Sequence, residues 1–401
     1  MAQTSIAQTF AVQASTWGRL TTTSLAHMTE HLYVGVITVV LPVMAPALGL
    51  SMAQVGLVVS IRSLVAGLSN IPSGLLADSA QKRNLILGLF LILIGLSSLL
   101  MSFAVGFWTL VLLMAVGAIG AGGFHPQSLA ILSSAYRERR ALALGVHDSS
   151  GNLGEVLAPL TIGTLLTYMD WRSVLQVWAV PGLAIGFFYA LFCSETNAAP
   201  VSRAGLKRSL WEGVFKNRTV LSMLLISVFR TMGQTALVTF LPLYLTLELM
   251  LPVGTMGIYI SILFLFAGFA PSVSGWVSDR IGRLPLMVAG CALSAISLLA
   301  VPYLSPGISL GLGCAAVGTM LWSLRPIVFA AAMEAAPPEL AGSLVGFMFT
   351  GNMGLSFIAP ILVGLVADGY GLATAVAFIG AFPFVACLIA LSPLTRERSA
   401  I

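Results

Sequence analysis

Charged residues are scarce in this sequence. Only 8% of its 401 residues are Asp, Glu, Lys or Arg, whereas 58% are hydrophobic; an ordinary soluble domain is about 25% charged. No water-soluble fold could bury that much apolar surface. Because a membrane-spanning helix needs about 20 apolar residues, the chain has room for about a dozen spans with short connections. The composition predicts an all-α polytopic membrane protein.

Cysteine is also rare. The four cysteines fall singly within or at the ends of apolar runs, with no paired spacing. This pattern argues against a disulfide framework and against a thiolate metal site. The segment 1–23 is polar and lacks a short apolar core followed by a small-residue cleavage site, so we expect no removable signal peptide.

Twelve apolar runs bounded by charged or turn residues predict twelve transmembrane helices. Of the 19 basic residues, fifteen fall on one side of these spans and only Arg172 lies in a loop on the other, which predicts cytoplasmic termini. Basic residues spread over short loops form no continuous face for nucleic acid, so none is expected as a partner. The runs cover residues 22–48, 54–77, 84–104, 107–133, 140–168, 171–193, 219–246, 253–277, 284–303, 307–333, 340–367 and 370–393.

The two halves of the chain match each other at an offset of about 200 residues. The sequence GNLG at 151–154 matches GNMG at 351–354, and the Ala-Pro pair at 158–159 matches a second Ala-Pro pair at 359–360. Parallel repeats of this kind are typical of secondary transporters, whose site lies at the repeat interface. We therefore predict two pseudo-twofold-related six-helix bundles, residues 1–193 and 219–401, joined by a cytoplasmic linker, residues 194–218.

Two loop segments carry a family resemblance. Residues 74–78 (GLLAD), followed by Lys82 and Arg83, and residues 275–283 (GWVSDRIGR) resemble the loop motif of the major facilitator superfamily. The first copy lacks the usual Arg after its Asp. The resemblance implies a conformational motif, in which carboxylates pair with the cations of the loop and glycines let neighbouring helices approach. The alternative is that the basic residues only hold these loops on the cytoplasmic side of the membrane. Its residues are Gly74, Asp78, Arg83, Gly275, Asp279, Arg280 and Arg283.

Further segments narrow the resemblance: residues 24–27 (SLAH), 124–128 (FHPQS), 151–154 (GNLG), 158–160 (APL) and 342–346 (GSLVG). With these, the chain is most similar to the fosmidomycin-resistance group of drug efflux proteins. Gln127 stands where that group would have an acid, and Glu30-His31 replaces what looks like an Asn-Asp pair. Residues 154–163 are also similar to the fifth-helix motif of proton-coupled drug antiporters. The resemblance implies the major facilitator fold, antibiotic efflux and the bacterial inner membrane.

Six charged side chains, three of each sign, fall inside the predicted spans together with all four histidines. Each charge costs about 2.5–3.5 kcal/mol near a helix centre unless it is paired or hydrated, so we expect one polar chamber that compensates them. The charged residues are Glu30, Arg62, Asp148, Glu155, Arg230 and Arg325, and the histidines are His27, His31, His125 and His147.

Arginines are the candidate substrate ligands. The guanidinium fork suits a carboxylate or phosphonate, and Arg230 and Arg325 occupy positions equivalent to Glu30 and His125 in the other half. The alternative is permanent pairing of each Arg with an acid such as Glu30 or Asp148. For Arg62 the natural partner is Glu155 or Asp148, and a buried ion pair explains this residue equally well. The predicted substrate-binding residues are Arg230, Arg325, Gln234, His125, Trp322 and Arg62.

Acids and imidazoles are the candidate proton carriers, because both types can titrate in a chamber of low dielectric constant; a hydrogen-bonded structural cluster is the alternative. His27 and His31 could also ligate a metal with Glu30 or His125, but no cysteine or dense carboxylate set supports this, and we expect no metal and no cofactor. The predicted proton-coupling residues are Glu30, His27, His31, Asp148, Glu155 and His147.

These observations predict a monomeric secondary transporter in the lipid bilayer, working by alternating access. The expected activity is proton-coupled efflux, by antiport, of a small organic compound that is anionic. Uptake of an organic anion by proton symport or by anion exchange would use the same arginines. A non-transporting receptor or partner subunit is the rival from another class. No nucleophile–base set lies near a membrane face, so we expect no enzyme.

Overall fold

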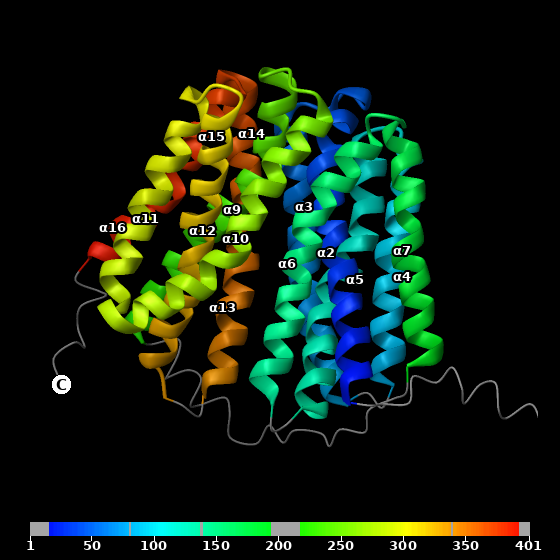
Figure 1. Ribbon diagram of the computed structural model, residues 1–401, viewed down its shortest axis with the longest axis vertical. Coiled ribbons are helices and arrows are strands. Elements are labelled where there is room, and N and C mark those ends of the chain that lie inside the picture. The colour runs from blue at the N-terminus through cyan, green and yellow to red at the C-terminus, as the bar shows by residue number, and fades with distance from the viewer. Residues whose placement is uncertain (1–15, 80–81, 137–138, 194–216, 338–339, 393–401) are drawn as a thin grey trace, which may run out of the picture. The chain divides into compact units, whose positions relative to one another are not determined.

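The computed structural model describes residues 16–79, 82–136, 139–193, 217–337 and 340–392. All regular structure in these residues is helical, as the composition predicted (Figure 1). The amino-terminal helices are α2 (Thr16–Ala47), α3 (Met52–Ser79), α4 (Arg83–Met101), α5 (Phe107–Ala135), α6 (Arg140–Leu165) and α7 (Trp171–Phe192). The carboxyl-terminal helices are α9 (Arg218–Leu243) with η2 (Tyr244–Glu248), α10 (Val253–Ile281), α11 (Arg283–Ala300) with η3 (Val301–Tyr303), α12 (Ile308–Glu334), α13 (Ala341–Ser356), α14 (Ile358–Tyr370), α15 (Leu372–Ile379) and α16 (Ala381–Leu391).

Eleven helical segments in the described residues are long and apolar enough to cross a membrane. The remaining predicted span forms α6, whose 26 residues are sufficient in length. It is more polar than the others because it carries His147, Asp148 and Glu155. A helix of this kind is stable in a bilayer only when its polar side chains face protein or a hydrated space, and α6 packs along α2.

The last two predicted spans are interrupted where the sequence analysis expected continuous helices. α13 ends at Ser356 and α15 ends at Ile379, four residues before Pro360 and Pro383. A proline has no N–H to donate to the carbonyl of residue i−4, and its ring crowds that carbonyl. Each break therefore occurs at the carbonyl that the proline leaves without its helical hydrogen bond.

The described chain divides into two compact units, the first formed by Met1–Gly49 with Ile61–Ser202 and the second by Leu50–Ser60 with Arg203–Ile401. Residues 194–216 of the predicted linker lie outside the described residues. The start of α3 groups with the second unit because Asp368 accepts hydrogen bonds from the backbone N–H groups of Met52, at 2.7 Å, and Ala53, at 2.9 Å. The predicted bundle boundaries stay a prediction, since the two units divide inside the predicted linker and residues 50–60 group with the second unit.

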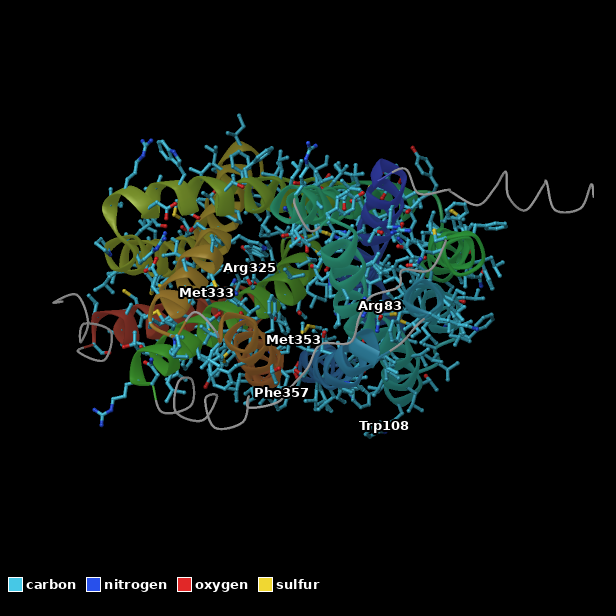
Figure 2. The ribbon with its side chains drawn as sticks, turned by 90° about the horizontal axis from the view of Figure 1, so that it is seen from below. Arg83, Trp108, Arg325, Met333, Met353 and Phe357 are labelled. Atoms are coloured by element: carbon cyan, nitrogen blue, oxygen red, sulfur yellow. The ribbon has the colours of Figure 1, made fainter. Side chains whose placement is uncertain are left out.

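Large apolar side chains cover the outside of the first unit. On α5, Trp108 is 71% exposed and Leu112 is 67% exposed, and Trp108 projects away from the helices (Figure 2). Such a surface would aggregate in water, whereas lipid tails solvate it. The polar side chains that the sequence analysis singled out therefore have to be sought between helices.

The amino terminus of α9 supports a prediction about stability. The Asn217 side-chain oxygen accepts hydrogen bonds from the N–H groups of Thr219 and Val220 at 3.1 and 3.2 Å, and its amide nitrogen donates to the Ala335 carbonyl at 2.7 Å. Losing the cap costs about 1 kcal/mol and losing the second bond about 1 kcal/mol more. Asn217→Ala should lower the unfolding free energy by about 2 kcal/mol. Asn217→Ser, which keeps the cap alone, should lower it by about half as much, as measured by thermal unfolding in detergent; equal effects would contradict the assignment.

Candidate functional site

Three histidines and a glutamate meet inside the first unit. The ring of His27 lies 4.5 Å from that of His31 and 5.4 Å from that of His125, between centroids. Glu30 Oε2 lies 3.6 Å from His31 Nε2 and 3.8 Å from His125 Nε2. One nitrogen or oxygen from each of the four residues lies within 4.8 Å of the other three. We call His27, Glu30, His31 and His125 the histidine cluster.

Residues of α6 orient two of these rings. The Glu155 Oε1 atom lies 3.0 Å from His31 Nδ1, and the backbone carbonyl of His147 lies 2.7 Å from His27 Nδ1. The His147 ring stacks on His27 with centroids 3.9 Å apart. A carbonyl oxygen can only accept, so His27 Nδ1 carries the proton of that hydrogen bond. The predicted proton-coupling residues Glu155 and His147 thus contact the cluster, whereas Asp148 is exposed on α6.

Glycine lets α6 approach the cluster. A Cβ atom on Gly151 would lie 2.6 Å from His27 Cε1, and one on Gly154 would lie 2.4 Å from the Met28 carbonyl oxygen. Both distances are shorter than any ordinary contact. The sequence analysis used the GNLG segment for the internal repeat and for the family resemblance; the structure shows that its glycines make room for α2.

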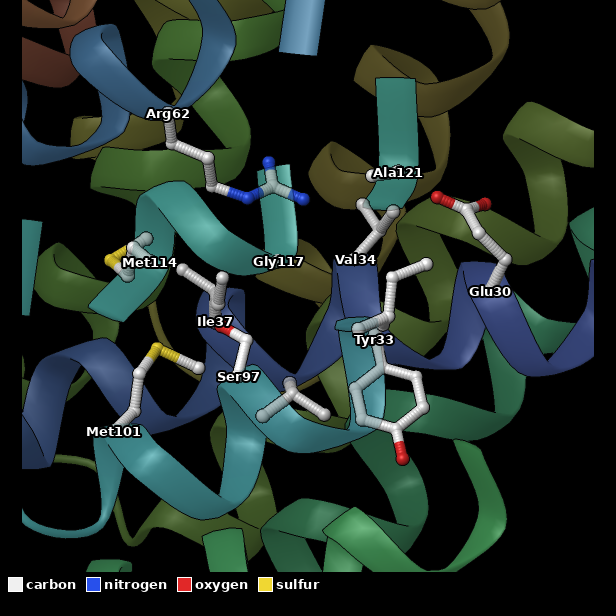
Figure 3. A pocket seen from close by; sticks show the side chains of 12 residues that line it. Glu30, Tyr33, Val34, Ile37, Arg62, Ser97, Met101, Met114, Gly117 and Ala121 are labelled. Carbon is white, nitrogen blue, oxygen red and sulfur yellow. The ribbon is translucent and has the colours of Figure 1, made fainter. Parts of the chain in front are cut away.

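The buried part of the cluster adjoins a small cavity. His27 is 4% exposed and Glu30 2% exposed, and Glu30 Oε2 has no hydrogen-bond partner among the described residues. The cavity measures ≈ 20 Å³, which is enough for about one water molecule. Arg62 and Glu30 both line it (Figure 3). A cation and an anion therefore share the wall of one cavity.

The predicted partners of Arg62 are Glu155 and Asp148. Glu155 contacts His31, and Asp148 is exposed. Within the described residues, no carboxylate oxygen lies within 4.0 Å of the Arg62 guanidinium. The substrate-binding role of Arg62 stays a prediction, and its nearest described acid on the cavity wall is Glu30.

The second unit contains two arginines on the predicted substrate helices. Arg230 on α9 is 3% exposed; its Nη1 donates to Gln234 Oε1 at 2.5 Å and its Nη2 to Thr231 Oγ1 at 2.9 Å. Its Nε is buried without a hydrogen-bond partner among the described residues. Thr231 was not predicted, although its position next to Arg230 could have indicated it. Every described hydrogen-bond partner of this buried cation is neutral.

Arg325 on α12 is exposed, and its guanidinium carbon lies 5.7 Å from the centroid of the Phe349 ring (Figure 2). It is close enough to Arg230 for the two positive charges to interact unfavourably. Trp322, predicted on the same helix, packs edge-on against Phe264 with centroids 6.0 Å apart. Its contact with substrate stays a prediction.

The described acids of the second unit have partners of their own. Glu248 accepts from the Ala373 N–H at 2.8 Å, and Asp368 accepts from the start of α3. Asp279 Oδ1 lies 2.5 Å from Arg283 Nη1, and Glu334 Oε1 lies 3.0 Å from Arg283 Nη2. Within the described part of this unit, therefore, no carboxylate neutralises Arg230 or Arg325.

The second loop motif is described more fully than the first. Arg283 joins Asp279 to Glu334, and the Arg280 guanidinium lies 3.6 Å from the Trp276 ring centroid. Arg83 is 5% exposed, and the side chain of Asp78 lies outside the described residues. Close helix approach was expected at Gly74 and Gly275, but among described residues no atom lies within 4 Å of a Cβ added at either. Within the part of the chain that the structure describes, neither glycine of this motif lies at a close helix contact.

A sequence profile described as the Major Facilitator Superfamily matches residues 23–360. The chain belongs to the major facilitator superfamily. It is therefore a multi-pass membrane transporter for small molecules and not an enzyme, as the sequence analysis predicted.

The relatives within this superfamily include proteins named for different substrates. The chain is 27% identical over 359 residues to a probable L-galactonate transporter of Escherichia coli, covering 80% of this chain and 76% of the relative. It is 24% identical over 391 residues to the fosmidomycin resistance protein of Escherichia coli, covering 96% and 95%. The resemblance to the fosmidomycin-resistance group is thus confirmed at the level of sequence similarity.

Solved structures support the major facilitator fold. A bacterial homologue of the human lysosomal transporter Spinster matches with a TM-score of 0.79 and 18% identity, covering 93% of this chain and 95% of that one. The nucleoside transporter NupG matches with a TM-score of 0.76 and 13% identity, covering 93% and 98%. At such low identity, these matches establish the fold alone.

The contact between α6 and the histidine cluster supports a second prediction. Gly151→Ala places a methyl group against the His27 ring, and overpacking of this kind costs about 1–3 kcal/mol. The unfolding midpoint in detergent should fall. Gly145→Ala, on the same helix, adds its methyl group where no described atom lies within 4 Å, so it should leave the midpoint unchanged or raise it. Equal midpoints for both variants would contradict the packing assigned to Gly151.

Proposed function

We propose that this protein exports a small organic anion in exchange for protons. The observation that carries the proposal is the pair Arg230 and Arg325, two cations for which the described part of their unit contains no neutralising acid. An anion bound by one or both would relieve their mutual repulsion. Forked hydrogen bonds to a carboxylate or phosphonate are the interaction for which guanidinium is best suited.

The environment of Arg230 favours a ligand role over a structural one. A buried charge that stabilises a scaffold is normally paired with an opposite charge, whereas Gln234 and Thr231 orient Arg230 without neutralising it. Burial also strengthens any charge interaction that a bound anion makes. Arg325, which is exposed, would be the accessible member of the pair.

Proton coupling is the second part of the proposal. The first unit carries the carboxylates Glu30, Asp148 and Glu155 within its helices, and His31 lies between two of them. The protein exchanges the anion for the proton if it cannot bind both at the same time. We place both termini in the cytoplasm from the distribution of basic residues, and the bacterial relatives favour the inner membrane.

The names of some relatives favour export, and the names of others favour uptake. Export is favoured by the fosmidomycin resistance protein and by the multidrug resistance protein MdtG, which is 25% identical over 327 residues. Uptake of an organic acid is the second candidate. It is favoured by the probable L-galactonate transporter and by a probable 4-methylmuconolactone transporter, 27% identical over 376 residues.

Proteoliposomes with a pH-sensitive dye inside distinguish these candidates. L-galactonate, fosmidomycin and tetraphenylphosphonium are added outside in turn, with no imposed pH gradient. Antiport moves protons out as an anion enters, so the interior should become alkaline with one of the anions only. Acidification would establish symport instead, and a response to the cation alone would contradict the role of the arginines.

Arg230→Gln should reduce the initial rate of anion transport about 30-fold or more, because removing one member of a desolvated charge pair costs about 2–5 kcal/mol. Arg172→Gln is the matched control, since it removes the same charge from the first turn of α7 in the first unit. Both variants should keep the unfolding midpoint of the unaltered protein. A folded Arg230→Gln variant with full activity would exclude anion binding by this residue.

Three substitutions identify the proton carrier: Glu30→Gln, Asp148→Asn and Glu155→Gln. The variant that lacks the carrier should lose anion-driven proton movement but retain anion counterflow, because the anion site is unchanged. Asp170→Asn, which alters the exposed cap of α7, is the control and should keep both activities. If all three variants still move protons, none of these carboxylates is obligatory.

A further inference from the structure

We propose that the histidine cluster is a binding site for a divalent transition-metal ion of the Zn²⁺ class, with His27, Glu30, His31 and His125 as ligands. The inference goes beyond the proposed function, because binding of a metal ion is measured without transport. The sequence analysis expected no metal because no cysteine or dense carboxylate set accompanies these histidines. Three imidazoles and a carboxylate are nevertheless a complete set for a tetrahedral ion.

The spacing of the cluster approaches that of a coordination shell. Ligand atoms 2.0–2.2 Å from a tetrahedral ion lie about 3.4 Å from one another. Glu30 Oε2 is 3.6 Å from His31 Nε2 and 3.8 Å from His125 Nε2, and the four candidate atoms lie within 4.8 Å of each other. Small side-chain rotations would therefore suffice to close the shell.

The outer hydrogen bonds leave the correct nitrogens for a metal. A metal-binding histidine usually donates its second ring N–H to a carboxylate or a backbone carbonyl, which fixes its tautomer and its orientation. His31 Nδ1 contacts the Glu155 carboxylate at 3.0 Å, and His27 Nδ1 donates to the His147 carbonyl at 2.7 Å. In the neutral imidazoles, each Nε2 then carries the lone pair.

Glu30 supplies the second, independent indication. It is 2% exposed, and its Oε2 atom has no hydrogen-bond partner among the described residues although it faces two imidazole nitrogens. Burying a carboxylate oxygen without a partner is costly. A cation held between Glu30 and the three rings would supply the interaction that this oxygen lacks.

The types of ligand atom select the class of ion, and two of the ligands are partly exposed. Imidazole nitrogens favour Zn²⁺, Cu²⁺, Ni²⁺ and Fe²⁺ over Mg²⁺ and Ca²⁺, which require oxygen ligands. The His125 side chain is 38% exposed and that of His31 19% exposed. Two of the four ligands are therefore partly exposed, whereas His27 and Glu30 are buried.

The test uses the full chain, purified in detergent with a histidine-free affinity tag and freed of metal by a chelating resin. Cobalt(II) is the probe, because a four-coordinate Co²⁺ ion absorbs visible light far more strongly than the hydrated ion. We expect one Co²⁺ per chain, with the absorption of a tetrahedral nitrogen–oxygen site, and displacement by one equivalent of Zn²⁺. Absence of this absorption at a stoichiometric concentration of Co²⁺ would overturn the proposal.

Variants decide whether the cluster supplies the ligands. His125→Gln is the first choice, because a partly exposed side chain tolerates substitution, and Glu30→Gln is the second. Each should weaken binding by more than about 100-fold, whereas Glu155→Gln, which alters an outer partner, should weaken it about 10–100-fold. His147→Phe keeps a flat ring against His27 and removes no ligand, so it should bind Co²⁺ as the unaltered protein does.

Two results would contradict the assignment even if the unaltered protein binds cobalt. One is unchanged affinity in folded His125→Gln and Glu30→Gln variants, which would place the ion elsewhere. The other is loss of binding in folded His147→Phe alone. If the protein binds the metal ion but shows no proton-coupled transport, the proposed function is contradicted and this inference is intact. If it shows proton-coupled transport but binds no metal ion, this inference is contradicted and the proposed function is intact.

Discussion

A charge inside a lipid bilayer must find its compensation within the protein, because the hydrocarbon offers neither water nor counterions. This constraint explains most of what is specific about the chain. Its apolar side chains face outward, as Trp108 does on α5, and its polar groups collect between helices. The histidine cluster, the cavity at Glu30 and the environment of Arg230 are three local responses to the same requirement.

The two units meet the requirement in different ways. In the first unit, acids and imidazoles are close enough to compensate one another, as Glu155, His31 and Glu30 show. In the second unit, Gln234 and Thr231 hydrogen-bond to Arg230 while no described acid of that unit neutralises it. A compensated cluster suits a small cation, whether a proton or a metal ion, and an uncompensated guanidinium suits an anion.

Close helix packing makes this chemistry possible. The His27 ring is held against α6 because Gly151 has no side chain there, and the His147 carbonyl then accepts the His27 N–H. Small residues at helix interfaces are the usual means of bringing backbones together in membranes. In this chain they also determine which ring nitrogen carries the proton.

The sequence alone determined the fold class and the helices, because membrane insertion depends on composition and length, which are local properties. It also identified His27, Glu30, Arg230 and Arg325, since charges and imidazoles inside apolar runs are conspicuous. Only the tertiary structure decided that Glu155 contacts His31 rather than Arg62 and that, among the described residues, neither Gly74 nor Gly275 lies at a close helix contact. These outcomes depend on which helices are neighbours and on how each is rotated about its axis, and the order of residues in a single chain does not contain that information.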